Sequence, residues 1–207
     1  MEVGGWKGIL GGMREDAARS WDERYQREEA VPERGPAAFL VEHVDLLPPA
    51  GRALDMAMGT GRNAVYLASL GHEVTGIDIS PVAVARCRAE ARRRGLRIEA
   101  VCADLTSYPL AREAYDIVLN FYYLDRRLCP GLAEALRPGG VLVFETFTTE
   151  QRRFGWGPTQ DEHLLRPGEL RALFPQLEAL VYREGIQQGE RGPKEVAGLV
   201  GRKGGRR

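Results

Sequence analysis

The sequence predicts an α/β protein in which helices cover both faces of a doubly wound, mostly parallel sheet. Five short apolar runs alternate with segments of helical spacing, as they do in successive βα units. Two further extended runs come last, and the polar stretch between them is typical of a hairpin. We therefore expect seven strands, the last two antiparallel. A chain of 207 residues is large enough for one such domain and small for two.

The expected elements follow one another in a regular order along the chain. Proline and glycine, which seldom continue a helix, mark most of the boundaries. Ser80 followed by Pro81 is a strong helix start, because serine caps the first amides and proline fits the first helical position. We expect helices over residues 14–29, 37–47, 62–70, 81–94, 126–136 and 167–174. We expect strands over residues 53–58, 72–78, 96–101, 115–121, 141–147, 177–184 and 195–201, with irregular chain over 148–166 and a polar loop, QQGERGPK, before the last strand.

The stretch RALDMAMGTGRNA, residues 52–64, combines a strand, a glycine turn and the start of a helix. Gly59 and Gly61 have no Cβ, so the backbone can approach a ligand closely, and the helix begins with unpaired amides. Ligands of doubly wound sheets bind beyond the carboxyl ends of the strands. Polar residues stand at or near those ends in the later strands: Asp78, Asp104 and Asn120. The sequence therefore predicts a nucleotide-type cofactor site here.

Two classes of cofactor are compatible with this stretch. Gly59 to Ala64 fits G-x-G-x-x-A, and Asp78 follows about 20 residues later, as in the dinucleotide fingerprint. Asp55, inside the strand, and Asp104 instead favour a cofactor without phosphate, because a carboxylate repels a pyrophosphate. The chain beyond this half is also short for a separate substrate domain. An NAD(P)-dependent oxidoreductase or a silent cofactor-binding module remains as an alternative.

Taken in order, the segments ALDMAMGTGRNAVYLA, VTGIDIS, CADL, YDIVLNFYY and LRPGGVLVFET resemble the class I S-adenosylmethionine-dependent methyltransferases, over residues 14–201. The segment SWDERY, residues 20–25, resembles the tellurite-resistance and thiopurine-methyltransferase-like branch. This resemblance implies a Rossmann-like fold, S-adenosyl-L-methionine as cofactor and methyl transfer to a small molecule. One position departs from the family pattern D-x-G-x-G-x-G, since Ala57 replaces its first glycine. We expect the loop to survive, with slightly shifted cofactor contacts.

The resemblance also implies roles for individual residues. Asp55 would hold the cofactor's ammonium, Asp78 both ribose hydroxyls and Asp104 the adenine amino group. Acids suit a cofactor that carries an ammonium and a sulfonium but no phosphate. The complete predicted cofactor site is Asp55, Ala57, Gly59, Gly61, Asp78, Ile79, Asp104, Leu105 and Asn120. Asp116, at the start of a strand, is expected to be structural.

Five aromatic residues are candidates for a substrate pocket: Trp21, Tyr25, Tyr122, Tyr123 and Trp156. Trp21 and Tyr25 lie four residues apart, on one helix face, where aromatic rings would cover a sulfonium. Packing against the core is the alternative for both. Residues 14–50 are therefore predicted as a helical lid over the domain of residues 14–201. The expected acceptor is a soft nucleophile, such as a thiol or a tellurite-like oxyanion, which needs little help from a base. We predict neither a catalytic base nor a metal site.

Composition indicates what kind of partner to expect. The formal net charge is zero, so a polyanionic partner is not indicated and nucleic acid is not expected. The run Arg92–Arg94 and the basic end leave an RNA or protein methyltransferase as an alternative. Three cysteines without metal-ligand spacing (Cys87, Cys102 and Cys129) fit a reducing cytoplasm, and no apolar run is long enough to span a membrane. Residues 1–13 and 202–207 are expected to be flexible ends. The oligomeric state is open.

Overall fold

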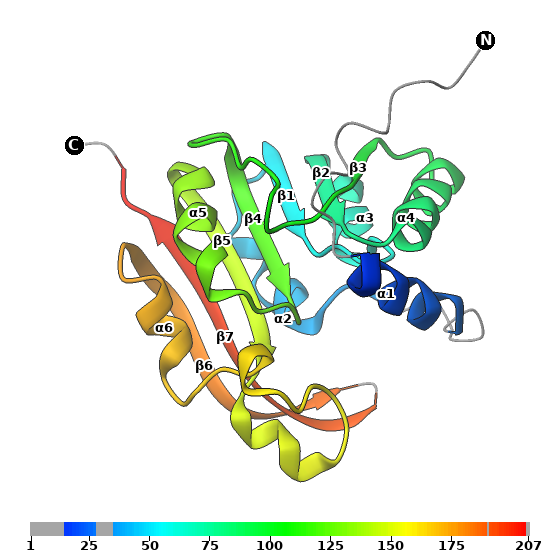
Figure 1. Ribbon diagram of the computed structural model, residues 1–207. Helices are drawn as coiled ribbons and strands as arrows, with labels where there is room; N and C mark the ends of the chain where they lie inside the picture. The colour runs from blue at the N-terminus through cyan, green and yellow to red at the C-terminus, as the bar shows by residue number, and fades with distance from the viewer. Residues whose placement is uncertain (1–14, 28–34, 190, 206–207) are drawn as a thin grey trace.

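The computed structural model describes residues 15–27, 35–189 and 191–205 (Figure 1). Its seven strands form one sheet in the order β3-β2-β1-β4-β5-β7-β6. The strands are β1 (Arg52–Met56), β2 (Glu73–Asp78), β3 (Ile98–Cys102), β4 (Tyr115–Phe121), β5 (Leu136–Phe147), β6 (Leu177–Gly189) and β7 (Gly192–Lys203). The first five are mutually parallel, while β7 runs antiparallel to both β5 and β6. The predicted seven-stranded, Rossmann-like sheet with a C-terminal antiparallel hairpin is confirmed.

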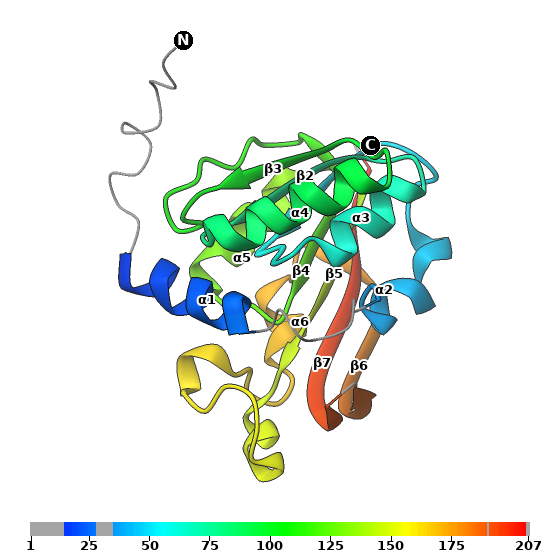
Figure 2. The ribbon, with the colours of Figure 1, turned by 90° about the vertical axis from the view of Figure 1, so that its right-hand side faces the viewer.

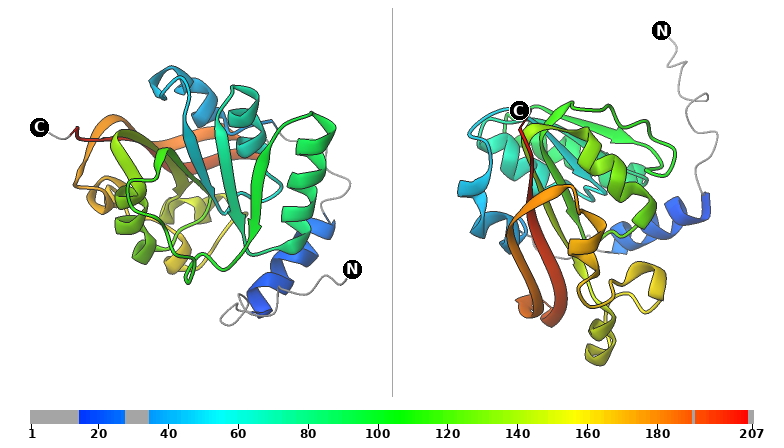
Figure 3. Two further views of the ribbon diagram at one scale, coloured as in Figure 1. Left: turned by 90° about the horizontal axis from the view of Figure 1, so that it is seen from above. Right: turned by 90° about the vertical axis from the view of Figure 1, so that its left-hand side faces the viewer.

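Helices pack on both faces of this sheet (Figures 2 and 3). They are α1 (Glu15–Arg27), α2 (Ala38–Glu42), α3 (Arg62–Ser69), α4 (Pro81–Arg93), α5 (Cys129–Ala135) and α6 (Glu169–Leu173). Helices α2, α3 and α4 cover one face, and α5 and α6 cover the other. Helix α1 lies beyond the end of the sheet, against α4. None of the helices in the described ranges is long and apolar enough to cross a membrane.

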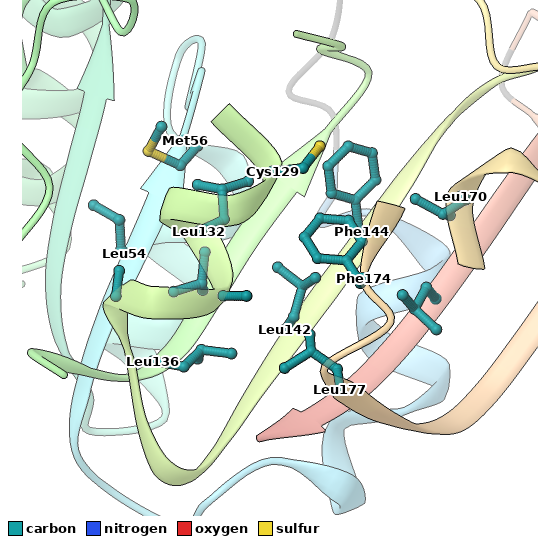
Figure 4. Close-up of a cluster of buried hydrophobic side chains, with 14 of the residues drawn as sticks. Leu54, Met56, Cys129, Leu132, Leu136, Leu142, Phe144, Leu170, Phe174 and Leu177 are labelled. Carbon is teal, nitrogen blue, oxygen red and sulfur yellow. The ribbon is translucent and has the colours of Figure 1, made fainter. Parts of the chain in front are cut away.

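The strand period of two divides the apolar side chains of each strand between two cores. On β5, Leu142 and Phe144 belong to the core under α5 and α6, whereas Val141 and Val143 belong to the core under α2 and α3. Figure 4 shows part of the first core, where the rings of Phe144 and Phe174 lie 5.6 Å apart. We call the end of the sheet at which the parallel strands have their C-terminal residues the carboxyl edge.

The final hairpin is longer than predicted. The polar loop expected over residues 187–194 is wrong, because β6 and β7 continue through it and pair Gln187 with Lys194 and Gly189 with Gly192. Backbone pairing at a hairpin tip needs no apolar side chains, so the polar composition concealed the pairing. The hairpin therefore projects beyond the carboxyl edge (Figure 1).

Strand β7 also takes in the start of the predicted flexible tail. Arg202 and Lys203 belong to the strand, and the Lys203 ammonium donates to the Leu136 carbonyl at 2.7 Å. The tail prediction over residues 202–207 is wrong for these two residues, because antiparallel pairing with β5 and β6 holds them. Residues 206–207 lie outside the described ranges, as do residues 1–13.

Two other segments differ from their predicted form. The helix expected over residues 37–47 is divided into α2 and a 3-10 turn, Val44–Leu46. The segment 148–166, expected to be irregular, contains 3-10 turns at Thr149–Phe154 and Asp161–His163. Arg126 ties it to the core by donating to Glu169 at 2.7 Å and to the carbonyls of Glu162 and Leu164 at 3.0 and 2.8 Å. This segment is therefore anchored beside the carboxyl edge, although its sequence has no regular pattern.

Candidate functional site

The loop between β1 and α3 has an unusual backbone. Ala57, Gly59 and Gly61 all have positive φ angles, of 51°, 57° and 85°. Only glycine adopts this left-handed region without a steric cost. A Cβ on Gly61 would also overlap the sulfur of Cys87, which packs against the loop from α4. The loop thus packs tightly against α4, and Gly61 is the N-cap residue of α3.

Asp55 is the least satisfied acid of this region. Its side chain is 1% exposed, and its Oδ2 atom has no hydrogen-bond partner among the described residues. Burial raises the pKa of Asp55 to about 7, against the opposing effects of the Arg62 guanidinium and the Ala64 amide. An orphaned, fully buried carboxylate oxygen is costly unless a partner arrives. The geometry therefore leaves an acceptor for a cation at the start of the glycine loop.

Asp78, at the end of β2, holds the glycine loop in place. Its Oδ2 accepts from the Gly59 amide at 2.8 Å, and its Oδ1 accepts from the Ser80 amide at 2.9 Å. Burial raises the pKa of Asp78, the Ser80 and Gly59 amides oppose this rise, and Asp22 adds to it. Each carboxylate oxygen can accept more than one hydrogen bond, so these two contacts leave room for hydroxyl donors.

Helix α1 docks on the start of α4 and reaches the glycine loop. The Ser80 hydroxyl donates to Asp22, and the Val82 amide points at the same carboxylate oxygen at 3.4 Å. An acid here complements the positive end of the α4 dipole. A Cβ on Gly59 would lie 2.9 Å from the hydroxyl oxygen of Tyr25, and Trp21 stacks on Tyr25 with 5.9 Å between ring centroids. The structure thus brings Tyr25 to the loop, whereas Trp21 is 37% exposed and has the Arg24 guanidinium over its ring at 4.8 Å.

The other predicted cofactor residues lie along the same edge. Asp104 is buried, and its Oδ1 accepts from the amide and the hydroxyl of Thr106, both at 2.8 Å. Leu105 is buried in the core under α5, and Ile79 is half-buried. Asn120, at the end of β4, is buried and donates its side-chain amide to the Tyr123 carbonyl at 2.7 Å. Every predicted cofactor residue thus lies at or next to the ends of β1 to β4.

The remaining predicted aromatics divide between the two faces of the sheet. Tyr122 lies on the face of α2 and α3, and its ring is 5.2 Å from that of Phe147, which meets Trp156 edge-on at 5.7 Å. Tyr123 packs against the opposite core. Gln151, fully buried, holds Trp156 in position by donating to its carbonyl at 2.9 Å. Tyr122 and Trp156 therefore share one wall, and Tyr123 lies apart from it.

Behind Tyr122 lies a buried group of charges, which we call the Glu145 cluster: Tyr122, Glu145, Arg183 and Lys194. Glu145 is fully buried and accepts from the Tyr122 hydroxyl at 2.7 Å, the Lys194 ammonium at 2.7 Å and the Arg183 guanidinium at 2.9 Å. Burial opposes ionisation of Glu145, but these donors outweigh it and hold its pKa below the ordinary value. Burial and the adjacent carboxylate raise the pKa of Tyr122, so its phenol stays protonated.

Sequence reasoning did not identify three groups at this edge. Arg62 lies over the Tyr122 ring at 5.6 Å, and Asn63 accepts from the Ala37 amide at 2.8 Å. Both directly follow the glycines, so their position was a usable signal. The Glu145 cluster joins the residue after β4 to residues of β5, β6 and β7, and no local pattern could have revealed it.

Comparison with known proteins agrees with this geometry. A family profile described as "Methyltransferase domain" matches residues 53–140, from β1 to the start of β5. The malonyl-[acyl-carrier protein] O-methyltransferase of Enterobacter lignolyticus is 37% identical over 106 residues, 48% of this chain and 40% of that protein. The demethylmenaquinone methyltransferase of Beutenbergia cavernae is 37% identical over 116 residues, 53% of this chain and 45% of that protein. The chain thus spans less than half the length of these curated relatives.

Solved structures are similar over most of the chain. TehB from Haemophilus influenzae superposes with a TM-score of 0.69 at 20% identity, over 88% of this chain and 67% of that one, which shows the shared fold. S-adenosyl-L-methionine is the cofactor of this class, and the residues present fit it. The oxygen of Asp55 that has no partner among the described residues suits its ammonium, and the backbone of the glycine loop carries no Cβ at Gly59 and Gly61. By fold, loop and the sequence match over residues 53–140, this chain is similar to the S-adenosylmethionine-dependent methyltransferases.

Proposed function

We propose that this chain transfers a methyl group from S-adenosyl-L-methionine to a small molecule with a soft nucleophile. Asp55 is the observation that carries the cofactor half of the proposal. A buried carboxylate oxygen without a partner, beside a glycine loop, is complementary to an ammonium group and would repel a pyrophosphate. This favours a methyltransferase over an NAD(P)-dependent oxidoreductase.

The assignment of the cofactor-binding residues follows the same logic. Asp55 would hold the ammonium, and Asp78, whose oxygens retain accepting capacity, would take the ribose hydroxyls. Asp104 would accept from the adenine amino group, with Leu105 and Ile79 beside the ring. Gly59, Gly61 and Ala57 would lie against the amino-acid part, and backbone at Asn120 would close the site.

Two elements beyond the carboxyl edge support a small-molecule substrate. Helix α1 lies across the glycine loop, and the segment 148–166 lies beyond the same edge of the sheet (Figures 1 and 2). Gln151 and Arg126 anchor that segment, so the wall of Tyr122 and Trp156 is a fixed surface. A macromolecular acceptor would need an open approach to the same edge.

The chain's residues act mainly by placement and by exclusion of water. When bound, the cofactor supplies an electrophilic methyl on a sulfonium. Trp21 and Tyr25 would cover that cation with aromatic faces, and the wall of Tyr122 and Trp156 would hold the acceptor in line with the methyl group. Because an anionic nucleophile loses its charge in the transfer, a dry aromatic site favours the reaction. Tyr122 is protonated and paired, so it is not the base, and a thiolate needs none.

We further propose the tellurite-resistance and thiopurine-methyltransferase-like branch, with a thiol or a tellurite-like oxyanion as acceptor. The segment SWDERY supports it, because two of its residues have separate tasks in the structure. Asp22 docks α1 on α4, while Tyr25 reaches Gly59. A segment that both attaches α1 to α4 and lies over the glycine loop is what a lid requires.

Calorimetry tests the cofactor half. The protein is titrated with S-adenosylmethionine, S-adenosylhomocysteine, NAD and NADP. We expect micromolar binding of the first two and none of the others. Binding of NAD without binding of S-adenosylhomocysteine would contradict the proposal.

A methyl-transfer assay tests the acceptor half. The protein is incubated with methyl-labelled S-adenosylmethionine and, separately, thiophenol, selenite, tellurite and bulk RNA. We expect label in a small organic or volatile product. Label that appears only in RNA, or only in protein, would show that the acceptor class is wrong even if the cofactor is right.

A further inference from the structure

We propose that Arg62 is a carboxylate-binding residue at the junction of the glycine loop and the Tyr122 wall. The inference rests on the proposed function and deepens it, because it assigns a charged group of the ligand to a residue that had no role. A carboxylate can come from the amino-acid part of the cofactor or from an acidic acceptor. The experiment below separates these two sources.

The position of Arg62 is electrostatically unfavourable for folding. It is the first residue of α3, directly after the cap Gly61, and no acid stands in the first turn of that helix. The start of a helix carries a partial positive charge, so a cation there is repelled. A half-buried arginine at this place therefore calls for an anionic partner.

The partners that Arg62 has among the described residues are uncharged. Its guanidinium approaches the Gly35 carbonyl at 3.5 Å, which is a long hydrogen bond, lies over the Tyr122 ring at 5.6 Å and interacts with the Tyr122 hydroxyl. Within the described ranges no carboxylate lies at ion-pair distance from it, and its effect on Asp55 is one of charge at longer range. A planar guanidinium offers five donors and pairs best with a carboxylate in a two-bond fork.

The other cations of this region are already occupied. The Lys194 ammonium lies 4.9 Å from the centre of the Tyr122 ring but donates to Glu145 at 2.7 Å. Arg183 donates to Glu145 at 2.9 Å and to Glu42 at 2.7 Å. Three cations thus surround Tyr122 and Glu145, with two carboxylates to match them. Among the described residues, Arg62 is the cation of this group without a carboxylate at ion-pair distance, and it lies on the side of the glycine loop.

The neighbouring Asp55 shows the opposite imbalance. Among the described residues, its buried Oδ2 has no donor, whereas Arg62 has no carboxylate at ion-pair distance. The two do not satisfy each other by direct contact, although both flank the same loop. An α-amino-acid group carries one ammonium and one carboxylate and would satisfy both residues at once. An acidic acceptor would satisfy Arg62 alone, with its body against the Tyr122 wall.

The test uses Arg62→Met with Arg52→Met as a matched control. Arg52 lies over the Tyr115 ring at the same 5.6 Å, at the opposite end of β1. Calorimetry measures the affinity of each protein for S-adenosylhomocysteine and for 5′-methylthioadenosine. The second compound has the nucleoside and the sulfur of the first but lacks its amino-acid part. Calorimetry then measures the affinity for benzoate and for benzamide on protein saturated with S-adenosylhomocysteine. Retained binding of methylthioadenosine shows that each variant is folded.

If Arg62 binds the carboxylate of the cofactor, Arg62→Met should weaken the affinity for S-adenosylhomocysteine about 10- to 100-fold, as loss of a charge-assisted pair does, and should leave the affinity for methylthioadenosine unchanged. If Arg62 binds the carboxylate of an acceptor, the affinity for benzoate should fall by the same factor, and benzamide should not bind. Arg52→Met changes neither. If Arg62→Met binds S-adenosylhomocysteine as the wild type does, and benzoate binding is unchanged or absent, the inference is overturned. If the wild type binds neither nucleoside ligand, the proposed function itself fails.

Discussion

Two aspartates lie on neighbouring strands but toward opposite ends of the sheet: Asp116 on β4 and Asp55 on β1. They differ in burial and in hydrogen-bond partners. At the amino end, one oxygen of Asp116 accepts from the Arg52 amide at 2.8 Å and from the Arg137 guanidinium at 2.9 Å. Gly51 packs so tightly against it that a Cβ there would overlap the carboxylate. At the carboxyl end, Asp55 is more deeply buried, and one oxygen has no partner.

The difference separates an acid that completes the fold from one that awaits a ligand. Asp116 contributes its hydrogen bonds in the protein alone, as its expected structural role requires. Asp55 costs free energy in the protein alone, because burial disfavours its charge and nothing offsets this fully. A buried, perturbed acid beside a glycine loop indicates a binding site, whereas a satisfied acid at a strand start does not.

The largest expected effect is on the pH dependence of stability. Asp55 has an ordinary pKa of 3.8 and a folded pKa of about 7, so the native protein keeps a proton that the unfolded chain releases between these values. The stabilisation is present at low pH and is lost as pH rises to 7, by up to about 4 kcal/mol at 1.36 kcal/mol per unit. Urea unfolding at several pH values measures it.

Asp55→Asn is the matched variant for that measurement. It removes the titrating group but keeps the shape, so its stability relative to the wild type should rise steadily from about pH 4 to pH 7. Other groups, such as His72, titrate in both proteins and cancel in the difference. A difference that stays flat across this range would mean that Asp55 is ionised in the folded protein.

The next effect is on ligand affinity. At pH 8, Asp55→Asn should weaken S-adenosylhomocysteine about 100-fold, because an ionised carboxylate that holds an ammonium is replaced by a neutral amide; this corresponds to about 2.7 kcal/mol. The wild-type affinity should also rise with pH up to about 7, and the variant should show no such rise. Calorimetry at pH 6 and pH 8 measures both. Equal affinities for the two proteins would remove Asp55 from the site.

Asp116→Asn makes the same chemical change at the other end of the sheet. It keeps one acceptor for the Arg52 amide but loses the charge that pairs with Arg137, a half-exposed ion pair. We expect a loss of about 1 kcal/mol in unfolding free energy and an unchanged affinity for S-adenosylhomocysteine. A fall in affinity like that of Asp55→Asn would mean that the two ends are not independent.

Much of the fold could be predicted because its signals are local. Alternation of apolar runs with helical spacing predicted all seven strands, and Ser80-Pro81 marked the start of α4, where the Ser80 hydroxyl accepts from the Ala83 amide at 3.1 Å. The misses in the last two strands have one cause. The tip of the hairpin and the end of β7 pair through backbone amides, which leave no trace in the pattern of side chains.

The candidate site shows the same limit more sharply. Glycines and polar residues at strand ends are visible in the sequence, so it could name Asp55, Asp78 and Asn120 as candidates. Glu145 meets Lys194 and Arg183 only because β7 returns beside β5, and the ion pairs join residues about 40 to 50 positions apart. The orphaned oxygen of Asp55 was likewise invisible, because it depends on which neighbours fail to reach it.

The smallest expected effect concerns Ala57, which stands where the family pattern has glycine and has a φ of 51°. A left-handed alanine costs about 1–2 kcal/mol, while glycine loses about 0.4–1 kcal/mol more backbone entropy on folding. Ala57→Gly should therefore stabilise by only about 0.5 kcal/mol. Glu113→Gly, at a φ of 48° in an exposed turn far from the loop, should give a similar gain and serves as the control.

S-adenosylhomocysteine affinity then separates the two positions, because the Ala57 methyl lies in the glycine loop between Asp55 and Gly59. If that methyl shifts the cofactor contacts, affinity changes in Ala57→Gly alone. An affinity change in neither variant would show that the carboxyl end tolerates a methyl in its glycine loop, and that the acids alone distinguish it from the amino end.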